Sequence, residues 1–193
     1  MKKTNKMSTQ AIVLSAVMTA LVVILQYFAA FLKPGPFSVT WALIPIVIGT
    51  ATAGKYVGAW LGFVFGVMVL VMGDAAPFMA VNVPGTIITV LLKGTACGFV
   101  SGIVYELIYK KSHNLVASVV SAAVVCPIVN TGVFLLGCFA FFMPTVTEWA
   151  GGENVGKYII FVLVGVNFLV EFGINVILSP VIVRLLNIRN KQL

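Results

Sequence analysis

The feature that most constrains this chain is the placement of its charged residues, which lie almost entirely at the ends of long apolar segments. Only 9% of its 193 residues are charged and 61% are hydrophobic, whereas a soluble domain carries about 25% charged residues. A helix of about 20 apolar residues is long enough to cross a bilayer. Because backbone polar groups must be satisfied internally in lipid, we predict an all-α integral membrane protein.

Hydropathy predicts six membrane-spanning helices in a single domain that covers residues 1–193. The predicted spans are residues 8–32, 39–53, 56–72, 85–109, 115–143 and 157–184. Spans of this length account for nearly all of the chain. The connections are too short to hold a separate soluble catalytic or nucleotide-binding domain.

Basic residues are distributed unequally between the two predicted sides of the membrane. An even number of spans places both termini on one side, which then carries nine basic residues: Lys2, Lys3, Lys6, Lys55, Lys110, Lys111, Arg184, Arg189 and Lys191. The opposite side carries two basic residues and three acids: Lys33, Lys157, Asp74, Glu148 and Glu153. Cytoplasmic loops carry such an excess, so we predict that both termini are cytoplasmic. The net charge of +7 follows from this topology, and we expect no nucleic-acid partner.

A carboxylate lies in the middle of the last predicted span. Asn167, Glu171 and Asn175 recur every four residues, so they share one helix face. An acid at the centre of a membrane helix costs roughly 2.5–3.5 kcal/mol on insertion scales and normally faces the bundle interior or a polar cavity. The stripe indicates either a cavity for a polar solute or a buried structural network.

Further polar residues lie at comparable predicted depth in other spans. At about 1.5 Å per residue, Lys93 and Asn167 lie roughly 10–14 Å from the outer ends, and Asn130 and Glu171 about 20 Å. We predict that these four side chains converge on one cavity open to the outside. Alternatively, Lys93 could pair with Glu171 or extend to the headgroups, and the asparagines could bridge helices.

The second outer connection adds two candidate site residues. Asp74 and Asn82 lie in this connection, where both could also be plain loop residues. Their predicted position on the outer side is the reason for including them in the candidate site.

The sequence contains no complete motif for enzymatic chemistry. Residues 49–56 resemble a phosphate-binding P-loop, but Tyr56 stands where Ser or Thr would bind magnesium, and no strand precedes it. The single histidine, His113, lies in a predicted cytoplasmic loop. The cysteines Cys97, Cys126 and Cys138 lack metal-ligand spacing. We therefore expect no enzyme, no metal site and no cofactor.

Small residues recur every four positions on three predicted helices. The sets are Gly54, Gly58, Gly62 and Gly66; Gly94, Gly98 and Gly102; and the pair Ala16 and Ala20. Small residues on one face let membrane helices approach closely, either within the chain or at an interface with another subunit.

The order and spacing of these segments resemble the substrate-binding S components of energy-coupling factor (ECF) vitamin transporters. The resemblance spans essentially the whole chain. It includes the AxxxA-like Ala16 to Ala20, the outer loop KPGPFSVTWALIPIVIG, the segment GAWLGFVFGVMVLV, and TIITVLLKGTACGFVSGIVYELIY with its basic residue followed by glycines.

This resemblance implies a role and a set of partners. Such proteins bind a vitamin or related micronutrient from outside and dock on a membrane T component that is driven by two cytoplasmic ATPases. Ala16 and Ala20 would form the surface that meets the T component, and the outer loop from Lys33 to Trp41 would act as a lid. The location would be the plasma membrane of a prokaryote, with the chain in contact with the lipid bilayer.

The polar residues of the predicted cavity limit which solute it can bind. Lys93 favours a ligand with a carboxylate, while Asn130, Asn167 and Glu171 can hydrogen-bond hydroxyl, amide or ring N–H groups. Pantothenate fits this combination best, and folate and riboflavin remain open. Stacking of a flat ring on Trp41 and Phe78 would favour those two.

Two other classes of protein also fit the sequence. A small stand-alone secondary transporter would use Glu171 as a proton-coupling site. A structural membrane protein without a transported ligand would use the polar stripe only to join helices.

Overall fold

The computed structural model of the chain describes residues 9–29, 31 and 40–190. All regular secondary structure within these residues is helical, as predicted. Four helical stretches among them are long and apolar enough to cross a membrane, and they are Thr9–Ala29, Val83–Ser112, Leu115–Trp149 and Asn167–Asn187. The remaining apolar helices are shorter, so six spans and cytoplasmic termini stay predictions.

Each predicted span corresponds to a helix or to a continuous helical run. The helices are α1 (Thr9–Ala29), α2 (Leu43–Ala53), α3 (Lys55–Val71), the short α4 (Ala76–Met79), α5 (Val83–Ser112) and α6 (Leu115–Gly137). A π-helical turn, η1 (Cys138–Phe142), joins α6 to α7 (Met143–Trp149). A second π-helical turn, η2 (Ile159–Gly165), joins α8 (Val155–Tyr158) to α9 (Val166–Asn190). Residues 32–39, which form most of the predicted lid, lie outside the described residues.

The helix boundaries have local causes in the sequence. The side chain of Asn82 accepts a hydrogen bond from the backbone N–H of Gly85 at the start of α5, and Asn114 caps α6 in the same way. Gly54 has φ of 94°, a left-handed conformation that favours glycine, and it separates α2 from α3. The P-loop-like sequence therefore lies at a turn between two helices.

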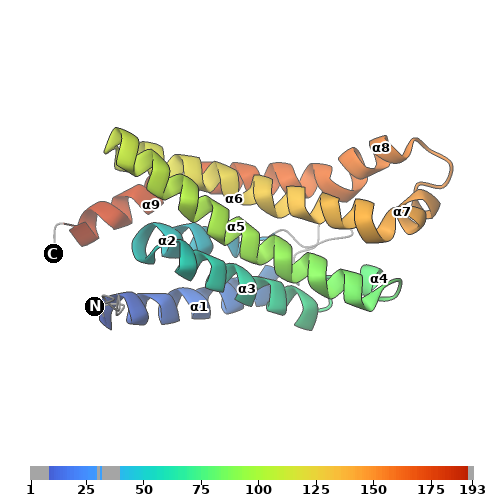
Figure 1. Cartoon of the computed structure of the whole chain (residues 1–193), viewed down its shortest axis with the longest axis horizontal. Helices are drawn as coiled ribbons and strands as arrows, with labels where there is room; N and C mark the ends of the chain where they lie inside the picture. The colour runs from blue at the N-terminus through green and yellow to red at the C-terminus, as the bar shows by residue number, and fades with distance from the viewer. Residues whose placement is uncertain (1–8, 30, 32–39, 191–193) are drawn as a thin grey trace, which may run out of the picture.

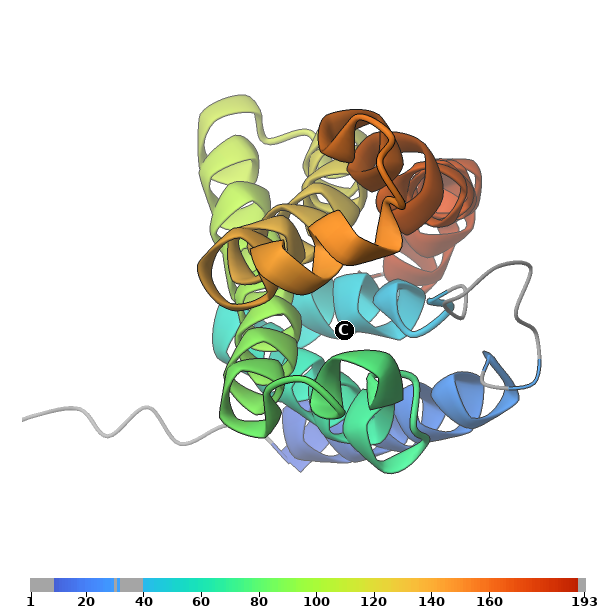
Figure 2. The ribbon, with the colours of Figure 1, turned by 90° about the vertical axis from the view of Figure 1, so that its right-hand side faces the viewer.

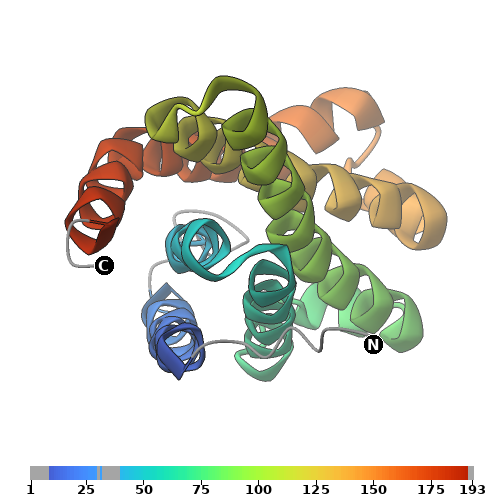
Figure 3. The same cartoon turned by 60° about the vertical axis from the view of Figure 1, so that its left-hand side comes forward.

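The long helices pack around α5, which crosses the bundle with α3 on one side and α6 on the other (Figure 1). α9 packs against α6, and α2 lies between α1 and α9 (Figure 3). The start of α1, the end of α9 and the α5–α6 turn lie at one end of the bundle (Figure 1). α4, α7 and α8 lie at the other end, which faces the viewer in Figure 2.

The glycine ladders bring α3 and α5 into backbone contact. A Cβ atom placed on Gly62 would meet the backbone of Gly94 and Thr95, and one on Gly58 would meet the carbonyl of Gly98. The ladders thus pack against each other within the chain, which is the first of the two roles predicted for them. This tight contact holds the middle of α5 in place, where Lys93 lies.

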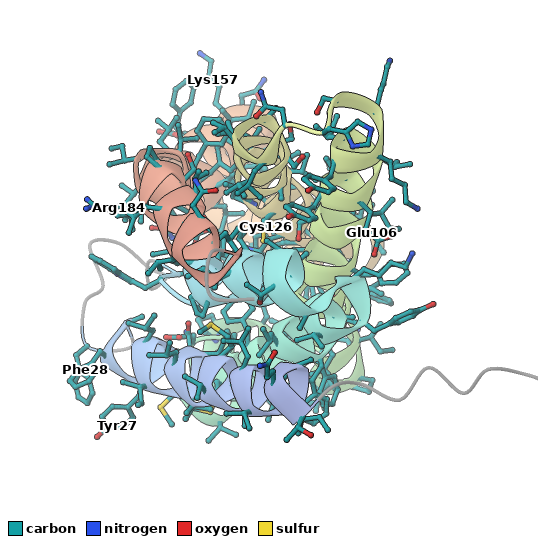
Figure 4. The ribbon with its side chains drawn as sticks, turned by 90° about the vertical axis from the view of Figure 1, so that its left-hand side faces the viewer. Tyr27, Phe28, Glu106, Cys126, Lys157 and Arg184 are labelled. Atoms are coloured by element: carbon teal, nitrogen blue, oxygen red, sulfur yellow. The ribbon has the colours of Figure 1, made fainter. Side chains whose placement is uncertain are left out.

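The outer surface of the bundle is apolar. Tyr27 and Phe28 point away from the other helices on α1 (Figure 4). Exposed apolar side chains recur on each of the long helices. Such a surface suits contact with lipid, and it is consistent with a multi-pass membrane protein.

Candidate functional site

A cavity lies where α5, α6 and the η2–α9 run meet the connection between α3 and α5. About 90 Å³ of this cavity is open to groups the size of a water molecule, and the wider hollow of about 670 Å³ includes the open solvent at its mouth. Its polar and aromatic lining residues are Thr40, Asp74, Phe78, Lys93, Asn130, Thr131, Phe134, Asn167, Phe168 and Glu171. α4 contributes Phe78, so the cavity lies toward the end of the bundle that sequence analysis predicts to be outside.

The four polar residues from the predicted spans line this one cavity. Lys93 comes from α5, Asn130 from α6, and Asn167 and Glu171 from α9. Asn130 and Glu171 are 4% and 5% exposed, whereas Lys93 and Asn167 are half-buried. Three helices thus bring together residues that are far apart in the sequence.

Lys93 is held by aromatic rings. Its Nζ atom lies 5.7 Å from the ring centroid of Phe65 and 5.4 Å from that of Phe134. These distances correspond to cation–π contacts. Among the described residues Lys93 forms no ion pair with a carboxylate, although Lys93 and Glu171 are close enough for their charges to attract each other.

The Glu171 carboxylate joins α9 to the segment that precedes α2. Its Oε1 atom accepts a hydrogen bond from the backbone N–H of Thr40 at 3.0 Å. One turn further along α9, the Nδ2 atom of Asn175 donates to the Glu171 carbonyl oxygen at 2.8 Å. Glu171 therefore faces the cavity, while Asn175 is engaged with its own helix and lies outside the cavity lining.

The second cavity acid, Asp74, is bound by a residue of α1. The Nε2 atom of Gln26 donates to Asp74 Oδ2 at 2.9 Å, and the two residues are 0% and 8% exposed. Gln26 is not among the site residues predicted from the sequence. A signal was present, because Gln26 is a polar residue within a long apolar segment, where a polar side chain normally faces the interior of the bundle.

Three other predicted site residues lie away from the cavity lining. Asn82 uses its side chain to cap α5, and Asn175 is buried on α9. Trp41 is 37% exposed. All three stay predicted site residues, although they are not part of this cavity lining.

Aromatic residues form the wall near α4. Phe78 lies edge-on to Phe134, Phe142 and Trp149, with centroid distances of 5.5, 4.9 and 5.3 Å. Phe134, which sequence analysis missed, lies one helical turn after Asn130 and so shares its face. Phe78 therefore belongs to a packed aromatic cluster as well as to the cavity wall.

The cavity offers both hydrogen-bond donors and acceptors. Asn130 Oδ1 is buried and has no hydrogen-bond partner among the described residues. Lys93 supplies an ammonium group, and Glu171 and Asp74 supply carboxyl groups. A buried acceptor without a partner costs free energy, and a bound solute can supply the missing donor.

Comparison with known proteins gives one family. A family model described as ECF transporter, substrate-specific component, matches residues 10–183. No curated protein and no solved structure matches the chain. The matched stretch includes every cavity residue named above, together with Ala16 and Ala20 on α1, both of which are exposed.

Proposed function

This chain belongs to the family of ECF transporter substrate-specific components, and we propose on that premise that its cavity binds a water-soluble vitamin or related micronutrient from outside the cell. The observation that carries the proposal is the cavity itself. Lys93, Asn130, Asn167 and Glu171 line it from three helices of an otherwise apolar protein. Ionisable side chains inside a membrane protein are costly, and a polar ligand is a sufficient reason to keep them.

We propose six membrane spans with both termini in the cytoplasm of a prokaryote, whose plasma membrane would hold the protein. The excess of basic residues on one predicted side supports this orientation. Reporter fusions at His113 and at Gly151, which lie in connections at opposite ends of the bundle, test it. A cytoplasmic signal from both fusions would contradict the orientation.

The proposed partners are a membrane T component and two cytoplasmic ATPases, which would supply the energy for import. Ala16 and Ala20 lie exposed on α1, as a docking surface requires. Leucine at both positions is expected to leave ligand binding intact and to abolish uptake in cells that contain the complete transporter. Uptake by the double variant at the wild-type rate would remove these alanines from the interface.

Pantothenate is the solute that matches the polar set best, with riboflavin and folate as the other candidates. Pantothenate combines a carboxylate for Lys93 with hydroxyl and amide groups for Asn130, Asn167 and Glu171. The aromatic wall at Phe78 would also accept a flat ring.

Native mass spectrometry of the detergent-purified chain tests the proposed function directly. A co-purified mass, or one acquired after incubation with a panel of vitamins, would establish binding and identify the solute. The Glu171→Gln variant should bind the same solute less well. An empty spectrum throughout would contradict the proposed function and favour a structural role.

A further inference from the structure

Lys93 and Glu171, a basic and an acidic residue, line the same cavity but form no ion pair with each other. The Glu171 carboxylate is engaged by the backbone N–H of Thr40 at 3.0 Å. The Lys93 ammonium lies between two phenylalanine rings. Neither has the other as a salt-bridge partner. In a low-dielectric setting, an ammonium and a carboxylate that border one space are costly until both are compensated.

The surroundings of Lys93 leave its hydrogen-bonding capacity unused. An ammonium has three N–H donors, and the faces of Phe65 and Phe134 provide electrostatic contact but no strong acceptor. No described protein acceptor bonds to Nζ. An anionic oxygen entering the cavity would meet this group in an apolar setting, where a charge-assisted hydrogen bond is strong.

The acceptors gather on the α6 and α9 side of the cavity. Asn130 Oδ1 is buried without a partner among the described residues. Asn130 Oδ1 requires a donor, and Lys93 does not supply it. A single ligand with an acid at one end and N–H or O–H groups at the other would satisfy both sides.

We propose that the cavity selects bifunctional organic acids, in which an anionic group binds Lys93 and a separate N–H or O–H donor binds Glu171 and Asn130. This inference rests on the proposed function, because it assumes that the cavity binds a solute. It excludes neutral and cationic compounds as cognate ligands. Lys93 is then the residue that determines selectivity for the acid.

Binding to matched pairs of probes tests this inference. Each pair contains an acid and its neutral derivative: pantothenate and panthenol, biotin and biotinamide, folate and its dimethyl ester. Riboflavin and thiamine serve as neutral and cationic probes. Isothermal titration calorimetry of the full-length chain in detergent measures each affinity. We expect wild-type protein to bind one of the acids and to bind its neutral derivative at least tenfold more weakly.

Variants of Lys93 and Glu171 test separately the binding of the acid group and the binding of the N–H or O–H donor. Lys93→Met should weaken binding of the acid by about 10- to 100-fold, the range for a lost hydrogen bond between charged groups, and should hardly change binding of the neutral derivative. Glu171→Gln should weaken both members of the pair. Lys93→Arg keeps the charge and should keep the preference for the acid. Lys93→Gln repeats the test if the methionine variant does not fold.

The chain contains a matched control at the other end of the bundle. Lys55 Nζ pairs with Glu106 Oε2 at 3.0 Å, away from the cavity lining. Lys55→Met and Glu106→Gln make the same chemical changes there, and both should leave all affinities unchanged. An effect of these controls equal to that of the cavity variants would overturn the assignment of roles.

The outcomes separate the inference from the proposed function. Preference for riboflavin, thiamine or a neutral derivative would overturn the inference and leave the proposed function standing. An equal loss of acid and neutral binding in Lys93→Met would give Lys93 a structural role and would also overturn it. Failure of every probe to bind, with no co-purified ligand, would contradict both.

Discussion

The hydrogen bond between Gln26 and Asp74 provides a sharp test of how α1 is joined to the cavity. Gln26 is fully buried on α1, and Asp74 lies in the connection that follows α3. Their side chains meet at 2.9 Å, although the residues are 48 positions apart. Gln26→Leu keeps a similar volume and removes the donor. Asp74→Ala removes the acceptor.

The expected magnitude follows from burial and charge. A hydrogen bond to a charged group contributes about 1.5–3 kcal/mol, and a buried acceptor that loses its donor costs about 1–3 kcal/mol. We therefore expect Gln26→Leu to lower the free energy of unfolding by about 2 kcal/mol. In the double variant the two effects should not add, and we expect a coupling energy of about 1–2 kcal/mol.

Equilibrium unfolding in mixed micelles, followed by circular dichroism, measures all four members of this double-mutant cycle. Thr19→Val is the control, because Thr19 accepts a hydrogen bond from Trp60 Nε1 at 3.2 Å on the exposed side of α1. Its cost should be below about 1 kcal/mol. Strictly additive effects of Gln26→Leu and Asp74→Ala would refute the direct contact.

Three further predictions concern helix packing, helix capping and the lining of the cavity. Gly62→Ala should destabilise the protein by about 1–3 kcal/mol, because the new methyl group would meet the backbone of α5. Gly132→Ala is the control and should not destabilise the protein, because a Cβ atom there would meet no other atom. Unfolding in mixed micelles measures both variants. Asn82→Ala should cost about 1 kcal/mol through the lost cap of α5, with no change of ligand affinity in calorimetry. Trp41→Ala should leave ligand affinity unchanged, because Trp41 does not line the cavity. A large loss of affinity would show that Trp41 belongs to the binding site.

Much of the fold follows from local patterns in the sequence. Apolar segment length predicts where the helices lie, because a membrane helix must span a fixed thickness with its own hydrogen bonds satisfied. The four-residue spacing of Gly58, Gly62 and Gly66 predicts a tight helix contact. Depth counted along the helices placed Lys93, Asn130, Asn167 and Glu171 in the same outer half of the membrane, roughly 10–20 Å from the outer ends, and these four line a single cavity.

Other features of the site had no such signal. The N–H group that Thr40 donates to Glu171 belongs to the backbone, and every residue type except proline carries one. Asn82 and Asn130 are chemically identical, yet one caps a helix and the other faces the cavity. The residue type determines which hydrogen bonds a side chain can form. Which of them forms depends on the groups that the fold places beside that side chain.

The sequence by itself determined that this is a helical membrane protein with polar groups on particular helix faces, because length, hydropathy and periodicity are local properties. Only the tertiary structure decided which faces meet. It placed Gln26 of α1 against Asp74, the backbone N–H of Thr40 against Glu171, and the ring of Phe134 against Lys93. Such contacts depend on the relative rotation and crossing of helices distant in the sequence, which no local pattern specifies.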